Sequence, residues 1–340
     1  MSFGACAKMA KLSIIIPVYY NEENLPLLYA DIRKKIIEPA LFDYEIVMVD
    51  DGSGDGSWAE MEKIASMDNN VRIFHLSRNF GSHAAILCGL EHCSGDCAVI
   101  KAADLQEPTE LIPKMFERWQ QGYNVVLAVR QDREESGSQK FFANFYYRLV
   151  RTFALKQMPA NGFDIYLIDR KVIDVLSMMD EKNSALTGQI LWSGFKTAEV
   201  PYVRQERKLG KSRWTLQKKI RLVMDTLYSF STVPITAVTL VGAAAFLVSL
   251  IWAIVVLVNK IAGNIPVSGF TTMFIFQLFS FGITMTTLGI IGGYLWRTFD
   301  ASRSRPIYII EKDNRKPVSD FEGSSKAQEL SEQVNGAQQG

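Results

Sequence analysis

The sequence predicts an α/β domain built on a mostly parallel sheet, followed by two helices long enough to cross a membrane. Two observations lead to this fold class. Short apolar runs alternate with amphipathic segments through the first half of the chain, which is typical of strand–helix–strand units. Later, Pro234–Val258 and Phe270–Trp296 contain no charged residue. Each stretch can span a hydrocarbon core about 30 Å thick.

The predicted strands are Lys11–Tyr19, Tyr44–Val49, Val71–Leu76, Cys97–Ile100 and Val125–Val129. Amphipathic helices are expected between them, near Leu25–Ile37, Trp58–Met67 and Thr109–Gln121, with another that ends near Glu91. Phe195–Tyr202 is predicted as an edge strand, and Tyr308–Glu311 as a small strand that returns to the domain. A sheet covered by helices on both faces accounts for strands that are apolar throughout.

Overall charge and cysteine content exclude several classes of protein. The 340 residues carry a net charge of +1, so no nucleic-acid partner is indicated. None of the four cysteines forms a C-x-x-C pair, which argues against a zinc ribbon or a disulfide framework. Lys and Arg are concentrated in Val203–Arg221, just before the first apolar stretch, where they suit an anionic lipid surface.

Polar residues recur where the predicted strands end. They are Glu22, Asp50, Asp51, Arg78 and Asp104. The carboxyl ends of parallel strands share one edge of the sheet, and ligands bind there in open α/β folds. Asp104 and Gln106 offer oxygen ligands that suit Mg²⁺ or Mn²⁺. The same stretch also suits a simple strand-to-helix loop, with Pro108 at the start of the next helix.

The loop Asp50–Ser57 has two alternative interpretations. A dinucleotide-binding turn would need Gly at position 57, which is Ser here. An EF-hand calcium loop would follow a helix, whereas this loop follows a predicted strand.

Four motifs in order, IPVYYNEENL, VDDGSGDGS, SRNFGSHAAILCGL and ADLQEP, resemble the signature of inverting family 2 glycosyltransferases. Those enzymes have a nucleotide-sugar-binding fold (GT-A, Rossmann-like). Over about residues 11–310, the chain is most similar to the polyprenyl-phosphate subgroup, which includes bactoprenol glucosyltransferases and dolichyl-phosphate mannose synthases. The resemblance implies transfer of a hexose, with UDP-glucose as the expected donor, onto a polyprenyl phosphate such as undecaprenyl or dolichyl phosphate.

The resemblance also implies roles for particular residues. The nucleotide-sugar pocket would be lined by Pro17, Tyr19, Glu22, Asp51, Arg78 and Asp104, with Asp51 reaching the base. Asp104 and Gln106 would hold Mg²⁺ or Mn²⁺ on the diphosphate. Phosphate and acceptor contacts would come from Arg130, Arg133, Arg207, Gly210 and Ser212. The catalytic set would be Asp104, Asp164 and Arg207.

Two positions depart from the family pattern. Ala102 replaces the first Asp of the usual Asp-Ala-Asp-Leu-Gln, and Tyr166 stands where Arg is common. These departures leave open a catalytically weakened membrane scaffold or lipid-binding subunit. GDP-mannose, UDP-GlcNAc and a UDP-aminosugar also remain open as donors. A processive polysaccharide synthase would show Q-x-x-R-W, but position 210 is Gly.

The distribution of Lys and Arg predicts the topology, because positive charges favour the cytoplasmic side. Residues 1–213 are expected to form a cytoplasmic catalytic domain, with an interfacial amphipathic helix at about 140–157. A helix in the core is the alternative for that segment. A juxtamembrane segment (214–233), a first span (234–258), a short non-cytoplasmic loop (259–269) and a second span (270–296) follow. Residues 297–340 return to the cytoplasm, with a disordered tail. We thus expect a multi-pass protein of the cell (inner) membrane that forms a homo-oligomer.

Overall fold

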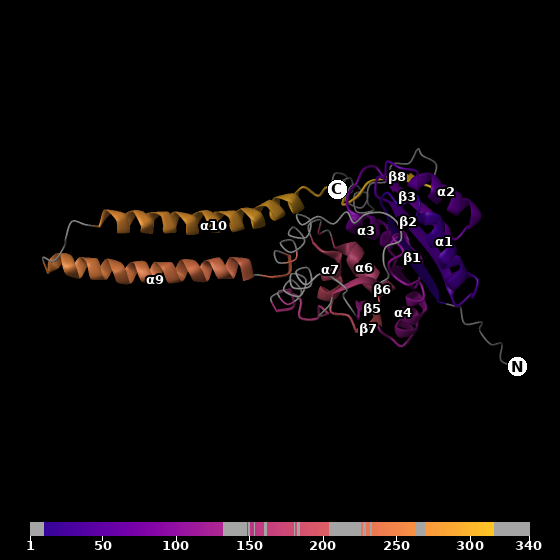
Figure 1. Cartoon of the computed structure of the whole chain (residues 1–340), viewed down its shortest axis with the longest axis horizontal. Coiled ribbons are helices and arrows are strands. Elements are labelled where there is room, and N and C mark those ends of the chain that lie inside the picture. The colour runs from indigo at the N-terminus through magenta and orange to yellow at the C-terminus, as the bar shows by residue number, and fades with distance from the viewer. Residues whose placement is uncertain are drawn as a thin grey trace, which may run out of the picture.

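The computed structural model describes residues 10–131, 148, 150–152, 154–159, 162–179, 181, 184–203, 226, 229–231, 233–262 and 269–315. In these ranges the chain forms a sheet covered by helices, from which two long helices extend side by side (Figure 1).

The sheet has eight strands in the order β7-β5-β6-β4-β1-β2-β3-β8. Their bounds are β1 Lys11–Val18, β2 Asp43–Asp50, β3 Val71–Leu76, β4 Cys97–Ile100, β5 Val125–Arg130, β6 Phe163–Asp169, β7 Thr197–Tyr202 and β8 Ile310–Asp313. The pairs β4–β1, β1–β2, β2–β3 and β5–β7 are parallel. Strand β6 runs antiparallel between β4 and β5, and β8 runs antiparallel to β3. The predicted mostly parallel sheet is confirmed.

Helices cover both faces of this sheet. On one face lie α1 (Leu25–Ile32), which continues into a π-helical turn η1 (Arg33–Ile37), α2 (Ser57–Met67) and α4 (Leu111–Gln120). On the other face lie α3 (Ser82–His92), α6 (Arg170–Met178) and α7 (Leu186–Trp192). Strand side chains alternate between the two layers: Ile14 and Ile16 join the first cluster and Ile15 the second. Burial on both faces explains why the central strands are continuously apolar.

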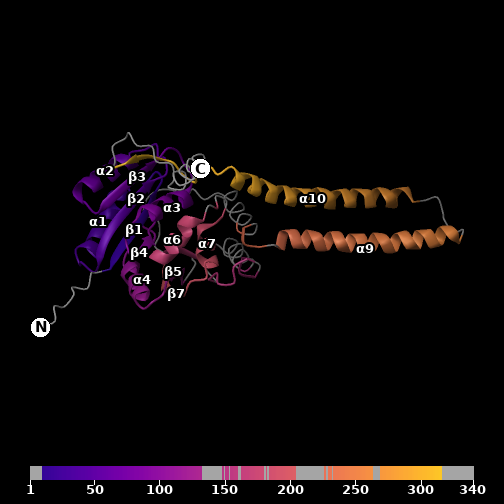
Figure 2. The same ribbon diagram turned by 180° about the vertical axis from the view of Figure 1, so that it is seen from behind.

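Two long helices follow the sheet: α9 (Val233–Ile261) and α10 (Phe270–Ser302). They contain the predicted spans, and both are long and apolar enough to cross a membrane. Their apolar side chains are exposed, Val248 in α9 and Met273 in α10 among them. Figure 2 shows the same pair from behind, again extending from one end of the sheet-containing unit.

After α10 the chain returns to the sheet. Tyr308 is buried, and its hydroxyl donates to Glu91 on α3. In β8, Asp313 accepts from the Arg72 guanidinium at 2.8 Å, and beyond it Arg315 donates to the Asn69 carbonyl at 3.1 Å. The predicted returning strand is therefore confirmed, two residues later than expected. It covers the outer edge of β3.

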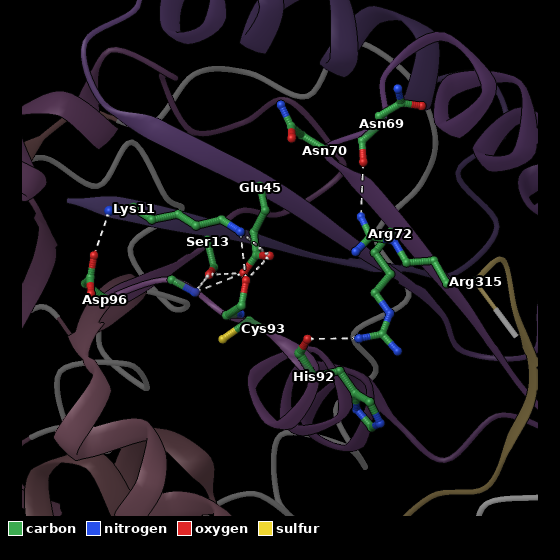
Figure 3. A network of polar contacts seen from close by, with 12 residues as sticks. Lys11, Ser13, Glu45, Asn69, Asn70, Arg72, His92, Cys93, Asp96 and Arg315 are labelled. Atoms are coloured by element: carbon green, nitrogen blue, oxygen red, sulfur yellow. Dashed lines mark hydrogen bonds and ion pairs between the residues drawn. The ribbon is translucent and has the colours of Figure 1, made fainter. Parts of the chain in front are cut away.

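A buried carboxylate connects β1, β2 and the turn before β4 near the amino ends of these strands (Figure 3). Glu45, near the start of β2, accepts from the Ser13 hydroxyl at 2.5 Å, the Ser94 hydroxyl at 2.7 Å and the Gly95 N–H at 3.1 Å. Lys11 lies 3.1 Å from the same carboxylate. The turn between α3 and β4 is thereby tied to β1 and β2. Burial alone would raise the pKa of Glu45, but these hydrogen bonds outweigh burial and hold that pKa below its usual range.

We predict that Glu45→Gln lowers the unfolding free energy at neutral pH by roughly 1.5–3 kcal/mol, because the buried network loses its negative charge and one of its two acceptor oxygens. A lowered pKa in the folded state stabilises the protein above the unfolded-state pKa. The wild-type advantage should therefore disappear as the pH falls through the folded-state pKa of Glu45.

Chemical denaturation of the purified chain at several pH values measures this effect, with the exposed Glu62→Gln on α2 as the matched control. Equal stability of the two variants at neutral pH would contradict the assignment.

Candidate active site

Three loops meet at the carboxyl ends of β1, β2 and β3. The Tyr20 N–H donates to the Ser53 hydroxyl at 2.9 Å, and the Asn21 N–H donates to the Ser57 hydroxyl at 2.9 Å. The Glu22 carboxylate accepts from the Gly56 N–H at 3.0 Å. The loop after β1 is thus bound along its length to the loop after β2, as the shared sheet edge predicts.

Asp51 joins the third loop to the other two. It is 3 % exposed and accepts from the Phe80 N–H at 2.7 Å and the Gly81 N–H at 2.9 Å. Burial raises the pKa of Asp51 to about 6; the two N–H groups oppose that shift, and the neighbouring Asp50 adds to it. A carboxyl group with this pKa changes its charge just below neutral pH.

The close approach of these loops requires glycine at position 52. Gly52 has a φ of +67°, and a Cβ there would lie 2.5 Å from the carbonyl carbon of Arg78. Any side chain would force the loops after β2 and β3 apart. Arg78 itself is exposed, and its guanidinium lies 4.1 Å from the centre of the Phe80 ring.

Asp50 ties the same loops to the sheet from the inside. Its fully buried carboxylate accepts from the Ser53 hydroxyl, and His75 Nδ1 lies 2.6 Å from its other oxygen. His75 packs edge-on against Trp58, with the ring centres 5.4 Å apart, and its Nε2 lies 3.9 Å from Glu311 of β8. The sequence analysis missed His75, although the parallel register pairs it with Asp50. The sequence signal that could have identified His75 is its position as a polar residue near the end of the apolar strand Val71–Leu76.

The loop that carries Asp104 leaves the same edge, because β4 pairs in parallel with β1. The Gln106 N–H donates to Asp104 at 3.2 Å, and Leu105 between them has a φ of +59°. Lys101 is 1 % exposed and donates to the Glu107 carbonyl, which closes the loop. Burial lowers the pKa of Lys101, while the Glu107 and Asp104 carboxylates oppose that shift. A buried cation therefore underlies the predicted metal motif.

The side chains of Asp104 and Gln106 suit a metal ion that is bound jointly by the protein and a ligand. Among the described residues, no group of three or more His, Cys, Asp or Glu side chains could hold a metal ion. Asp104 and Gln106 are partly exposed and offer one carboxylate and one amide oxygen. Mg²⁺ is commonly bound by one or two carboxylates together with phosphates and water. The motif therefore fits an ion held jointly with a diphosphate rather than an all-protein site.

Apart from Asp164, which lies on β6, the remaining predicted residues fall into three groups. Pro17 pairs with Val49 in the parallel register, and Tyr19 is partly buried against the Tyr20 ring, so both border the three loops. Arg130 ends β5 on the same edge of the sheet, where its Nε donates to the Tyr202 hydroxyl at 3.4 Å. The others lie outside the described residues: Arg133, Arg207, Gly210 and Ser212, together with most of the expected segments 140–157 and 214–233.

Strand β6 carries two positions that the sequence analysis singled out, Asp164 and Tyr166, and they lie in different surroundings. Asp164 is the second residue of this strand, and the antiparallel pairing with β5 places it at the edge where the loops gather. Its side chain lies outside the description. Tyr166 is 2 % exposed and packs in the second hydrophobic cluster near Phe163. The Tyr166 ring therefore belongs to the core, and whether the absence of Arg at this position alters contacts to a sugar or an acceptor stays a prediction.

We predict that His75→Ala destabilises the protein by roughly 1.5–3 kcal/mol, because the buried Asp50 carboxylate loses a hydrogen-bonding partner. Unfolding of the purified chain measures the change. Lys114→Ala, at an exposed position on α4, is the control and should leave stability nearly unchanged. Equal effects of the two substitutions would show that the Asp50–His75 contact contributes nothing.

Comparison with known proteins agrees with this geometry. A family model described as glycosyl transferase family 2 matches residues 13–181. An uncharacterized glycosyltransferase, YkcC, of Bacillus subtilis (strain 168) is 35% identical over 88% of this chain and 93% of its own length. The bactoprenol glucosyl transferase of Shigella phage SfV is 32% identical over 90% of this chain and 100% of its own.

A likeness to solved structures is also found, at low identity. The mannosyltransferase PcManGT from Pyrobaculum calidifontis, in complex with GDP-Man and Mn²⁺, is 15% identical with a TM-score of 0.45, over 83% of this chain and 88% of that one. That likeness is too distant to add to the sequence relatives, which cover nearly the whole chain at more than 30% identity. The chain therefore belongs to glycosyl transferase family 2, and its relatives include bactoprenol glucosyl transferases.

Proposed function

We propose that this glycosyltransferase moves a hexose from a UDP-sugar, with UDP-glucose as the first candidate, onto a polyprenyl phosphate at the cytoplasmic face of the cell membrane. The observation that carries the proposal is the placement of Asp51 and Asp104. They follow β2 and β4, the two strands that flank β1. Neighbouring strands lie about 4.8 Å apart, so the two loops begin about 10 Å from each other. A nucleoside diphosphate can bridge such a separation.

The proposed donor roles follow from these contacts. Asp51 binds the base, with Pro17 and Tyr19 beside it and Arg78 at the open side. Glu22 acts by holding Gly56, and hence the shape of the pocket. Asp104 and Gln106 would hold Mg²⁺ or Mn²⁺, which would stabilise the negative charge on the departing diphosphate. Lys101 keeps their loop closed from beneath.

The acceptor requires little activation. A phosphate oxygen is already anionic at neutral pH, so a direct displacement at the anomeric carbon with inversion needs no strong general base. Arg130 and Asp164 lie on the correct edge of the sheet for acceptor contacts. Arg133, Arg207, Gly210 and Ser212 are proposed for the same role on the family resemblance alone.

The membrane arrangement rests on the path of the chain. The sheet contributes β7 before α9 and β8 after α10, so the chain enters and leaves the helix pair on the same side. This supports a hairpin in which residues 1–213 and 297–340 share the cytoplasmic face and 259–269 lie opposite. The names of the bactoprenol relatives support a lipid acceptor. The expected homo-oligomer stays a prediction.

A catalytically weakened scaffold is the second candidate, and Ala102 is the observation that favours it. Incubation of the purified chain in vesicles with polyprenyl phosphate, Mg²⁺ and UDP-glucose tests the two functions. Release of UDP that depends on the lipid supports the enzyme, and its absence with every UDP- and GDP-sugar would support the scaffold.

We predict that Asp104→Asn lowers lipid-dependent UDP release on the order of 10²-fold, because the motif loses its carboxylate. Ala102→Asp should act oppositely on metal binding, since it adds a carboxylate, and should lower the Mn²⁺ concentration that gives half-maximal activity. The exposed Asp174→Asn on α6 is the control. Near-normal turnover of Asp104→Asn at saturating metal would exclude this role.

We also predict that donor affinity falls as the pH drops through about 6. The pKa of Asp51 is raised to about 6, so its carboxylate becomes protonated there and loses its charge as an acceptor. Calorimetric titration with UDP between pH 5 and 8 measures the effect. The nucleotide's own phosphate also titrates in this range, so Asp51→Asn provides the baseline. If both proteins show the same pH dependence, Asp51 does not bind the base.

A further inference from the structure

The end of α7 exposes a large aromatic side chain on the side of the sheet-containing unit from which the long helices extend. Trp192, the last residue of α7, is 66 % exposed, and Met178, the last residue of the neighbouring α6, is 72 % exposed. Figures 1 and 2 both place α7 at the end that faces α9 and α10, while α2 lies at the opposite end. The ring of an exposed tryptophan is a large apolar surface with one polar N–H group, and such residues are enriched where a protein contacts another molecule or a membrane.

Helix α7 packs directly against the start of the membrane-spanning pair. Gly188 lies so close to Phe230 that a Cβ on Gly188 would overlap the phenyl ring. Phe230 lies three residues before Val233, where α9 begins. The glycine therefore allows α7 to contact the chain at the point where it enters the first long helix.

The end of α10 meets the same short segment. The Tyr294 hydroxyl donates to the Ser231 carbonyl at 3.3 Å, and the Arg297 guanidinium donates to the Ser229 hydroxyl at 3.0 Å. Arg297 is the first charged residue after the long apolar run of α10. Residues 229–231 and 294–297 thus mark one level, at which apolar side chains give way to charged ones. For helices that cross a bilayer, this level is the membrane surface.

The position of Trp192 on α7 brings it to this level. It follows Gly188 by four residues, so both lie on one face of the helix, about 6 Å apart along its axis. A helical side chain leans over the preceding turn, which here contains Gly188. Tryptophan is enriched at the interface between lipid and water, where its ring meets acyl chains and its N–H meets polar groups.

We propose that Trp192 inserts into the headgroup region of the bilayer, and that α7 is a contact of the catalytic unit with lipid. The inference rests on the proposed crossing of the membrane by α9 and α10. A contact to one side of the helix pair limits rocking of the catalytic unit over the surface. It therefore fixes the orientation in which the sheet edge meets a lipid-bound acceptor.

Site-directed spin labelling of the full chain in phosphatidylethanolamine–phosphatidylglycerol vesicles tests this contact. Cys6→Ser leaves Cys88, Cys93 and Cys97, which are buried. Single labels are then placed through Trp192→Cys, Met67→Cys and Val248→Cys. Met67, at the end of α2, is 66 % exposed, as Trp192 is, and Val248 in α9 is 63 % exposed. These positions are exposed, so the substitutions should leave the fold intact, which circular dichroism verifies.

The label at 248 should collide mainly with oxygen, which concentrates in lipid, and the label at 67 mainly with a water-soluble nickel chelate. The label at 192 should shift clearly from the behaviour of 67 towards that of 248. If the label at position 192 behaves like the label at 67 while the label at 248 is in lipid, the proposed contact of α7 with lipid is overturned. The proposed membrane crossing of α9 and α10 then still stands. If 248 is also in water, both are overturned. If the label at 192 is shielded from both reagents and its spectrum shows dipolar broadening, two labels lie close together. That result would indicate a contact with a second copy of the chain and would also overturn the lipid contact.

Discussion

The candidate site depends on two adjacent buried carboxylates at the end of β2. Asp50 and Asp51 are 0 % and 3 % exposed. Asp50 binds the Ser53 hydroxyl and faces His75, whereas Asp51 binds the N–H groups of Phe80 and Gly81. The loops after β1, β2 and β3 are held together through these contacts. Neighbouring residues on an extended chain point to opposite sides, and so one dipeptide can serve both functions.

Burial of a carboxylate at this point has an electrostatic cost. Burial raises the pKa of Asp51 to about 6, although two backbone N–H groups oppose the shift. Glu45 shows the opposite balance near the amino end of β2, where more donors converge and hold its pKa low. The two ends of β2 therefore differ: the carboxylate at the amino end is stabilised in its charged form, whereas the carboxylate at the carboxyl end changes its charge just below neutral pH.

The path of the chain connects the candidate site with the long helices. Strand β8 lies beside β3 after the excursion through α9 and α10, and it brings Glu311 within 3.9 Å of His75 and Lys312 over the Trp58 ring at 5.5 Å. His75 in turn faces Asp50. The helix pair is thus held by α7 at its entrance and by β8 at its exit. A shift of the helices relative to the sheet would act on the strands that carry the proposed donor pocket.

The sequence predicted those parts of the structure that depend on local pattern, and it missed those that depend on pairing. Apolar runs located the parallel strands, and polar residues at their ends located the edge where Asp51 and Glu22 gather. Strand β6 was missed because it inserts antiparallel between β4 and β5, and its side chains alternate between two buried layers. The same burial places Tyr166, which stands where the family commonly has Arg, in the core. Lys101 gave no signal either, since only the folded loop shows that an ammonium group is buried beneath Asp104. The missing carboxylate at Ala102 therefore has to be judged together with Lys101. The proposed metal site has one fewer negative charge and a buried ammonium group nearby, so an ion there would depend mainly on the negative charge that its ligand brings.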